Sequence, residues 1–137
     1  MEYEEFIVDD MAHRLVVRPQ DIDVLLLPNL YGDILSDLGA GTIGGLGLAP
    51  SGCYGHDFAY FESAHGTAPD LTGKGVINPT ATLLSAAMML RHLNLDTAAD
   101  RLERAIGDVY LSNSDLTPDQ GGDATTETFA DAVIGAL

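Results

Sequence analysis

The chain has 137 residues, with 21 acidic side chains against 6 Lys and Arg, and a formal net charge of −15. A hydrophobic fraction of 46% is enough for a folded core and argues against global disorder. We expect no nucleic-acid or anionic-membrane binding, because there is no basic surface to meet phosphates. The longest apolar run, residues 83–90, is too short to span a bilayer, and the acidic start is unlike a signal peptide. These features predict a cytoplasmic protein, and its single cysteine excludes an internal disulfide.

The first third of the chain alternates strand-like and helix-like patterns. A short strand is predicted over residues 2–8, followed by a helix over residues 9–17 with Asp9 as its candidate cap. Residues 23–27, DVLLL, are typical of a strand buried on both faces of a parallel sheet. A helix is expected over residues 33–43, and the glycine-dense residues 39–55 are interpreted as a loop.

The remainder of the chain is predicted to be mostly helical. We expect a strand at residues 59–62, an irregular segment at 65–79, helices at 80–93, 96–112 and 125–137, and a turn at 117–122. Strands alternating with helices indicate an α/β class. Because the strands are few for the number of helices, the pattern suggests part of a larger domain, with a small complete domain as the alternative.

Two carboxylates in the motif NLYGDILSD have the spacing of a candidate metal site. Asp33 and Asp37 are four residues apart, which places them on one face of the predicted helix. Like charges at this spacing repel, and Mg²⁺ or Mn²⁺ would relieve the repulsion because both ions prefer oxygen ligands. The alternative is two solvated aspartates on a surface helix.

The segment from Glu62 to Pro79 is the second candidate site. Its glycines and prolines shape a loop that carries His65, Asp70 and Asn78, with a helix predicted directly after it. Backbone groups and the Asn amide can contact an adenine, and a carboxylate can accept both ribose hydroxyls. The glycine-rich GxGxxG fingerprint of dinucleotide-binding folds is absent. The alternative is a long surface loop with a structural histidine.

Four stretches together carry a resemblance to a known family: NLYGDILSD, GGLGLAPSG, HGTAPDLTGKGVINPTA and LSAAMMLRHL. The chain resembles the C-terminal part of the β-decarboxylating dehydrogenases, the isocitrate and 3-isopropylmalate dehydrogenase family. The resemblance implies an α/β fold, a partial three-layer α/β/α sandwich that is not a Rossmann fold. It places residues 1–48 at the end of a dimer-forming, metal-site domain and residues 49–137 in the C-terminal half of a cofactor-loop domain. The family's substrate-binding arginines and its catalytic tyrosine and lysine have no counterpart here, so the chain matches less than half of a subunit.

Each matching motif implies a role for particular residues of this chain. The resemblance implies Mg²⁺ or Mn²⁺ ligands at Asp9, Asp33 and Asp37, with Asp9 reaching the metal across a dimer interface. It implies cofactor contacts at Glu62, His65, Gly66, Thr67, Ala68, Asp70 and Asn78. Asp70 predicts NAD, because a carboxylate at this position accepts the ribose hydroxyls and repels the 2′-phosphate of NADP.

The family resemblance implies NAD-dependent oxidative decarboxylation of a small-molecule 2-hydroxy acid with a β-carboxylate. The motifs favour 3-isopropylmalate, and hence leucine biosynthesis, with isocitrate or homoisocitrate as the alternative. We expect the chain alone to be inactive and to need a homodimer or a complementary chain that supplies the missing half. A non-catalytic nucleotide-binding or regulatory subunit and a decayed gene product are the competing classes. Intact Asp33 and Asp37 argue against a non-catalytic relic.

Overall fold

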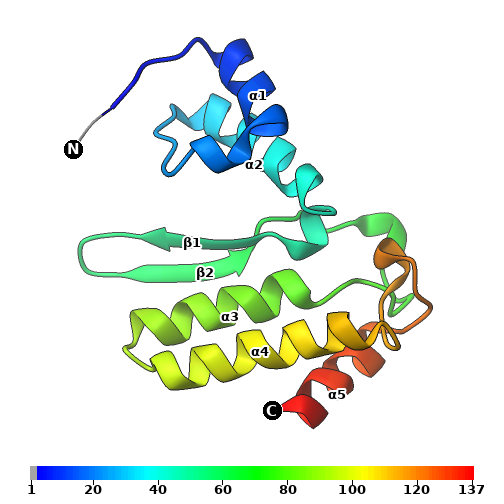
Figure 1. Ribbon diagram of the computed structural model, residues 1–137. Coiled ribbons are helices and arrows are strands. Elements are labelled where there is room, and N and C mark those ends of the chain that lie inside the picture. The colour runs from blue at the N-terminus through cyan, green and yellow to red at the C-terminus, as the bar shows by residue number, and fades with distance from the viewer. Residues whose placement is uncertain (1–2) are drawn as a thin grey trace. The chain divides into compact units, whose positions relative to one another are not determined.

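A computed structural model describes residues 3–137, which divide into two compact units, residues 3–43 and 44–137 (Figure 1). The division falls a few residues before the domain boundary predicted at residues 48 and 49. The described chain is mixed α/β, the class that the sequence predicts. Its helices and strands, in order, are α1 Val8–Val17, α2 Asn29–Thr42, β1 Pro50–Tyr54, β2 Ala59–Ser63, α3 Thr80–His92, α4 Asp96–Ser112 and α5 Thr126–Ala136. None of the helices within residues 3–137 is long and apolar enough to cross a membrane.

Unit 1, residues 3–43, is a pair of helices in contact with each other. Helix α2 begins at Asn29, four residues before the predicted start at residue 33, directly after Pro28 in the extended region. Helix α1 begins at Val8, and the predicted cap at Asp9 is wrong, because Ile7 is the N-cap and makes no side-chain cap bond. The Asp9 carboxylate instead accepts a hydrogen bond from the backbone N–H of Asp10 at 2.9 Å.

Both strands predicted in unit 1 are absent from its described residues. Residues 3–7 form no strand, residue 2 lies outside the described residues, and residues 23–27 belong to no sheet. Val24 is 74% exposed and Leu26 96% exposed. An apolar run predicts that a segment is buried. A strand also requires a neighbouring strand that pairs with its backbone hydrogen-bonding groups. No described segment of unit 1 supplies that neighbour.

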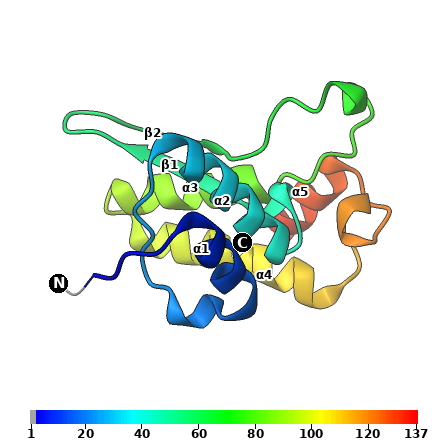
Figure 2. The ribbon, with the colours of Figure 1, turned by 90° about the horizontal axis from the view of Figure 1, so that it is seen from above.

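Unit 2, residues 44–137, begins with an antiparallel hairpin of β1 and β2, so the loop predicted over residues 39–55 is only partly correct. The hairpin packs on α3, α3 on α4, and α4 on α5 (Figures 1 and 2). The approach of the hairpin to α3 is close, because a Cβ on Gly52 would lie 3.0 Å from Phe61 and 3.1 Å from Met88. The opposite face of the hairpin exposes Cys53, Tyr60 and Glu62. The described residues thus form a sheet and one helical side of the expected three-layer sandwich.

The core of unit 2 lies between α4 and α5. Phe129 is fully buried, Val133 is 2% exposed, and both pack against Ala105, Ile106, Val109 and Leu116. On α4, Ala99, Ile106 and Val109 are also buried. Helix α5 is capped at its start, since the Thr125 hydroxyl accepts from the backbone N–H of Thr128 at 3.1 Å.

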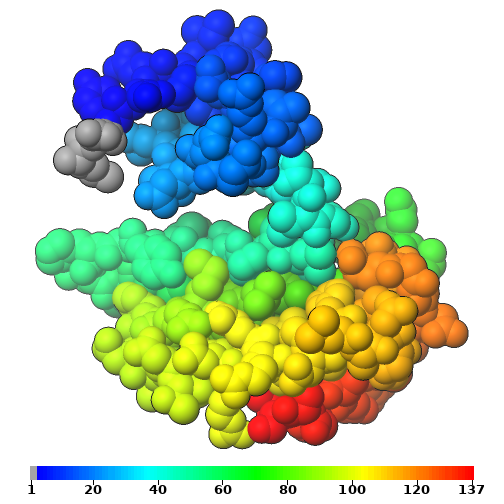
Figure 3. All heavy atoms as spheres, viewed as in Figure 1, coloured from blue at the N-terminus to red at the C-terminus, as the bar shows by residue number. Residues whose placement is uncertain are grey.

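The turn between α4 and α5 is closed by backbone contacts between its own residues. Ala124 donates its N–H to the carbonyl of Leu116 at 2.9 Å. A Cβ on Gly122 would lie 1.9 Å from that carbonyl oxygen, so only glycine fits there. Figures 1 and 3 show this turn, in orange, at the same end of unit 2 as the predicted cofactor loop, in green.

Candidate functional site

The predicted metal ligands Asp33 and Asp37 lie on α2 in unit 1, and both are exposed. Neither carboxylate forms a hydrogen bond or an ion pair with another residue of the described range 3–137. Asp10 on α1 is by contrast paired with Arg14 at 2.7 Å. Two unpaired carboxylates one helical turn apart suit a hard cation that takes oxygen ligands.

The three predicted metal ligands do not form a complete site within this chain. Asp9 lies in the first turn of α1 and is exposed. Among residues 3–137 there is no group of three or more His, Cys, Asp and Glu side chains close enough to hold a metal ion. The donor set therefore fits Mg²⁺ or Mn²⁺ in chemistry, but further ligands would have to come from elsewhere.

The cofactor loop, residues 62–79, leaves the end of β2 and returns to the start of α3 (Figure 2). The carbonyl of Gly66 accepts a hydrogen bond from Nδ1 of His65 at 2.9 Å. Because a carbonyl only accepts, Nδ1 carries the proton and Nε2 is left for another partner. Glu62 is exposed on β2, and its backbone carbonyl accepts from the Ser85 hydroxyl of α3 at 2.6 Å.

The middle of the cofactor loop contains a backbone conformation that side chains disfavour. Ala68 has φ 42° and ψ 61°, the left-handed region, at a cost of roughly 1–2 kcal/mol. It precedes a single 3-10 turn, Pro69–Leu71, which puts the Asp70 carboxylate in the first turn and exposed. Strained non-glycine residues are often found where a ligand binds, and Gly66 and Thr67 beside it are exposed too.

Asn78 differs from the other predicted cofactor residues, because it is only 3% exposed and both polar atoms of its side chain have protein partners. Its Nδ2 donates to the Tyr110 hydroxyl at 3.1 Å and to Oδ2 of Asp119 at 3.0 Å. Its Oδ1 accepts from the backbone N–H of Thr80 at 3.0 Å. The amide of Asn78 therefore bonds to the protein, and its contact with the cofactor stays a prediction.

Asp119 is the charged member of this network. Burial opposes ionisation, but hydrogen bonds from Thr117, Asn78 and Gln120 outweigh it and hold the pKa of the carboxyl below its usual value. Thr117 donates to Oδ1 at 2.6 Å and Gln120 to Oδ2 at 3.1 Å. Sequence reasoning missed Asp119 and Tyr110, because their partner lies more than thirty residues away along the chain.

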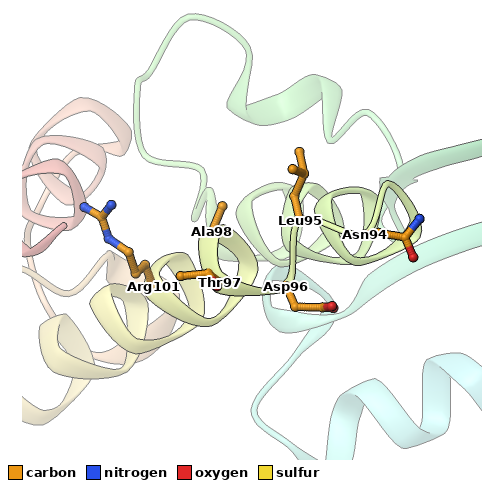
Figure 4. Close-up of a pocket in the computed structure, with 6 residues that line it drawn as sticks. All are labelled: Asn94, Leu95, Asp96, Thr97, Ala98 and Arg101. Atoms are coloured by element: carbon orange, nitrogen blue, oxygen red, sulfur yellow. The ribbon is translucent and has the colours of Figure 1, made fainter.

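A separate shallow depression lies where α3 turns into α4, at the end of α3 away from the cofactor loop (Figure 4). The charged side chains of Asp96 and Arg101 point in different directions there. Arg101 instead donates to the backbone carbonyl of Leu137 at 2.7 Å. This surface offers no converging set of polar groups and is not a second candidate site.

Comparisons with known proteins agree with this arrangement. The family model "Isocitrate/isopropylmalate dehydrogenase" matches residues 1–133. An isocitrate/homoisocitrate dehydrogenase from Thermus thermophilus is 57% identical over 134 residues, which cover 98% of this chain and 40% of the relative. A probable mitochondrial NAD isocitrate dehydrogenase subunit alpha from Drosophila melanogaster is 50% identical, over 100% of this chain and 36% of the relative. The crystal structure of isocitrate dehydrogenase from Methylococcus capsulatus matches with a TM-score of 0.95 at 44% identity, covering 99% of this chain and 41% of that one.

The fold matches part of the subunit of decarboxylating dehydrogenases. The chain belongs to the isocitrate/isopropylmalate dehydrogenase family, as the resemblance of its motifs predicted. It spans about 40% of the length of the Thermus relative and 36% of the Drosophila relative.

Proposed function

We propose that the chain carries the metal-site helix and the cofactor loop of an NAD-dependent enzyme that oxidatively decarboxylates isocitrate or homoisocitrate. The observation that carries the proposal is the joint presence of two unpaired carboxylates on α2 and an exposed Asp70 in the cofactor loop. The relatives support the substrate, because those compared above are named for isocitrate or homoisocitrate. The 3-isopropylmalate favoured by the sequence motifs is less well supported than its alternative.

The residues of unit 1 hold the metal in this proposal. Asp33 and Asp37 supply two carboxylate oxygens from one face of α2, and Asp9 belongs to the same set across a subunit interface. A bound Mg²⁺ or Mn²⁺ would act as a Lewis acid on the substrate's oxygen atoms. The exposed carboxylates need no rearrangement to accept the ion, since no described side chain competes for them.

The residues of unit 2 bind and orient NAD. Asp70 accepts the two hydroxyls of the adenosine ribose and repels an additional phosphate. His65 offers Nε2 beside the exposed Gly66 and Thr67 and the half-buried Ala68, and Glu62 is assigned to the nicotinamide end. When bound, NAD would accept a hydride from the carbon that bears the substrate's hydroxyl, so the loop serves by orientation rather than by proton transfer.

The metal assignment is tested in a complete subunit, meaning this chain together with the remainder of the family's subunit. With Mn²⁺, NAD and isocitrate, homoisocitrate or 3-isopropylmalate in parallel, NADH absorbance reports turnover. We expect Asp33→Asn to lower kcat by about 100-fold or more, because one metal ligand is lost. Asp21→Asn removes another exposed carboxylate of unit 1 and should leave kcat unchanged. Equal activity of Asp33→Asn and wild type at limiting Mn²⁺ would refute the assignment, and a preference for 3-isopropylmalate would refute the substrate.

The cofactor choice is tested by comparing NAD with NADP in the same complete subunit. We expect Asp70→Lys to lower the ratio of kcat/KM for NAD over NADP by at least tenfold, because the repulsion of the 2′-phosphate becomes attraction. Asp123→Asn alters an exposed carboxylate of the turn after α4 and serves as the control. A wild type that prefers NADP would show that another residue overrules Asp70.

The 137-residue chain by itself is expected to show no dehydrogenase activity. Its candidate residues are carboxylates and a cofactor loop, and no described side chain stands in the place of the family's catalytic tyrosine or lysine. Without them nothing positions the substrate or moves its protons. A metal-dependent rate of NADH formation by the purified chain, with contaminating host enzyme excluded, would contradict this expectation.

A further inference from the structure

Ser85 is a buried hydroxyl residue in the first half of α3, and it reaches across to the hairpin. The residue is 2% exposed. Its Oγ lies 2.6 Å from the carbonyl of Glu62 and 2.8 Å from that of Ala81, and it accepts from the N–H of Ser51 at 3.2 Å. A hydroxyl has a single proton to donate, and the shorter contact is the one to Glu62. One side chain of α3 thus joins both strands of the hairpin.

The two hairpin residues that Ser85 contacts lie directly opposite each other. Ser51 on β1 pairs with Glu62 on β2 in the register of the hairpin. The residue next to Ser51, Gly52, approaches α3 closely, because a Cβ there would lie 3.1 Å from Met88. The backbone of the hairpin is therefore fixed at this point by hydrogen bonds and by packing together.

Among residues 3–137, no side chain bonds to the Glu62 carboxylate. The preceding residue, Phe61, lies against His92 of α3, with 5.7 Å between the ring centroids. Because side chains alternate between the two faces of a strand, the exposed side chain of Glu62 lies on the opposite face. The direction of its carboxylate is therefore set by its backbone, which Ser85 holds one residue before β2 ends at Ser63.

We propose that Ser85 is a positioning residue, whose hydroxyl fixes the backbone of Glu62 and thereby the direction of the Glu62 carboxylate. The inference rests on the proposed function, in which Glu62 is assigned to the nicotinamide end of NAD. Ser85 is buried between α3 and the hairpin, so it acts through Glu62 and not on a ligand. Because the same hydroxyl holds Ser51, the carboxylate is oriented before a ligand binds, which lowers the entropy cost of binding.

The test is a double-mutant cycle on the complete subunit, with NADH binding followed by fluorescence titration. We expect Glu62→Gln to weaken NADH binding about tenfold, because a charged hydrogen-bond acceptor is lost. Ser85→Ala should weaken it about fivefold in the wild-type background and by less than about twofold in the Glu62→Gln background. A merely structural role of Ser85 would give the same loss in both backgrounds.

ADP, which lacks the nicotinamide nucleotide, separates local positioning from general damage. Ser85→Ala should change the dissociation constant of ADP by less than about 1.5-fold, because no contact near Glu62 is involved. Ser112→Ala is the matched control, since it removes a hydroxyl that bonds to the carbonyl of Val109 in its own helix at 2.8 Å. It should leave both dissociation constants at the wild-type values.

A second substitution guards against a variant that fails to fold. Ser85→Cys fills the same space with a weaker hydrogen-bonding group, so it should bind NADH and ADP as Ser85→Ala does. The thermal midpoint of each variant, measured alongside, identifies any that is unfolded. If Ser85→Ala is unfolded, Ser85→Cys decides the outcome.

The outcomes separate this inference from the proposed function. Equal losses from Ser85→Ala in the two backgrounds, or a parallel loss of ADP binding, would overturn the positioning role even if turnover with isocitrate is normal. Unchanged NADH binding in Ser85→Ala would overturn it as well. If Glu62→Gln binds NADH like wild type, the assignment of Glu62 and the positioning role are both refuted. A coupled loss in a subunit with no turnover on isocitrate or homoisocitrate supports the positioning role and refutes the proposed activity.

Discussion

The two units of the molecule contain similar apolar sequence and use it differently. Unit 2 buries Phe129, Val133 and the inward face of α4 in one cluster. Unit 1 buries Met11, Leu35 and Ala40, while the run at residues 23–27 remains largely exposed. Burial of an apolar side chain stabilises the fold by about 1.5–3 kcal/mol, so unit 2 has a core of its own and unit 1 has little. An apolar segment is buried only where other residues pack against it. Among the described residues, only unit 2 supplies those residues itself.

The largest expected difference between the units comes from their apolar side chains. Phe129→Ala should lower the free energy of unfolding by about 3–5 kcal/mol, because it empties a fully buried site. Leu26→Ala, at 96% exposure, should change it by less than about 0.5 kcal/mol. Urea denaturation of the chain followed by circular dichroism measures both. Comparable losses from the two substitutions would show that unit 1 also has a core.

The carboxylates of the two units should also differ in how the free energy of unfolding depends on pH. The pKa of Asp119 is lowered in the folded chain, so its stabilisation is fully present above its unfolded pKa of about 4 and is lost as pH falls through the folded value. Asp119→Asn should cost about 1–3 kcal/mol at pH 7, and the cost should shrink as pH falls below about 4. Asp21→Asn in unit 1, whose carboxylate has no partner among the described residues, should stay within about 0.5 kcal/mol. A cost for Asp119→Asn that is independent of pH would contradict the role of the charge.

Helix capping gives a smaller effect of the same kind. Thr125 caps α5 through a hydrogen bond from Thr128, and Thr125→Ala should cost about 1 kcal/mol. Asp9 does not cap α1, so Asp9→Ala should cost only the helix-dipole contribution, about 0.3–1 kcal/mol at low salt. Salt distinguishes the two losses of stability. It screens the interaction of the Asp9 charge with the helix dipole, but it does not weaken the Thr125 cap. A loss that persists in concentrated salt for Asp9→Ala would indicate a cap that the structure lacks.

Exposed ion pairs are expected to contribute least in both units. Arg91 joins α3 to Asp100 and Glu103 of α4 at 2.9 and 2.7 Å, and Arg14 pairs with Asp10 within α1. Arg91→Ala should lower the free energy of unfolding only slightly, because the pair is exposed, and Arg14→Ala should lower it by about 0.3–0.5 kcal/mol. Both losses should fall in concentrated salt. A larger loss for Arg14 would mean that its contact with the Phe6 ring, 4.6 Å to the centroid, matters more than its charge.

The sequence predicted those features whose cause is local. The helices over residues 80–93, 96–112 and 125–137 were expected within a residue or two, because periodicity acts between neighbouring residues. The sequence motifs also predicted the family to which the chain belongs. The strand at residues 23–27 was predicted wrongly, since its partner strand is not in the described chain.

The candidate site was predictable only in part for the same reason. The carboxylate pair on α2 was found by its spacing, and Asp70 was found by the family motif in which it stands. The hydrogen bonds of Asn78 to Tyr110 and Asp119 join residues more than thirty positions apart in the sequence. They therefore leave no local sequence pattern. The assignment of the metal and cofactor residues remains a prediction, which the experiments above test.

The order of packing in unit 2 has a kinetic consequence. The hairpin, α3, α4 and α5 each contact the element next to them along the chain. Closing short loops costs little entropy, and domains built from such local contacts fold quickly. Residues 44–137 should therefore fold early in the assembly of a subunit. The run at residues 23–27 of unit 1 should become buried only later, when strands from the rest of the subunit pair with it.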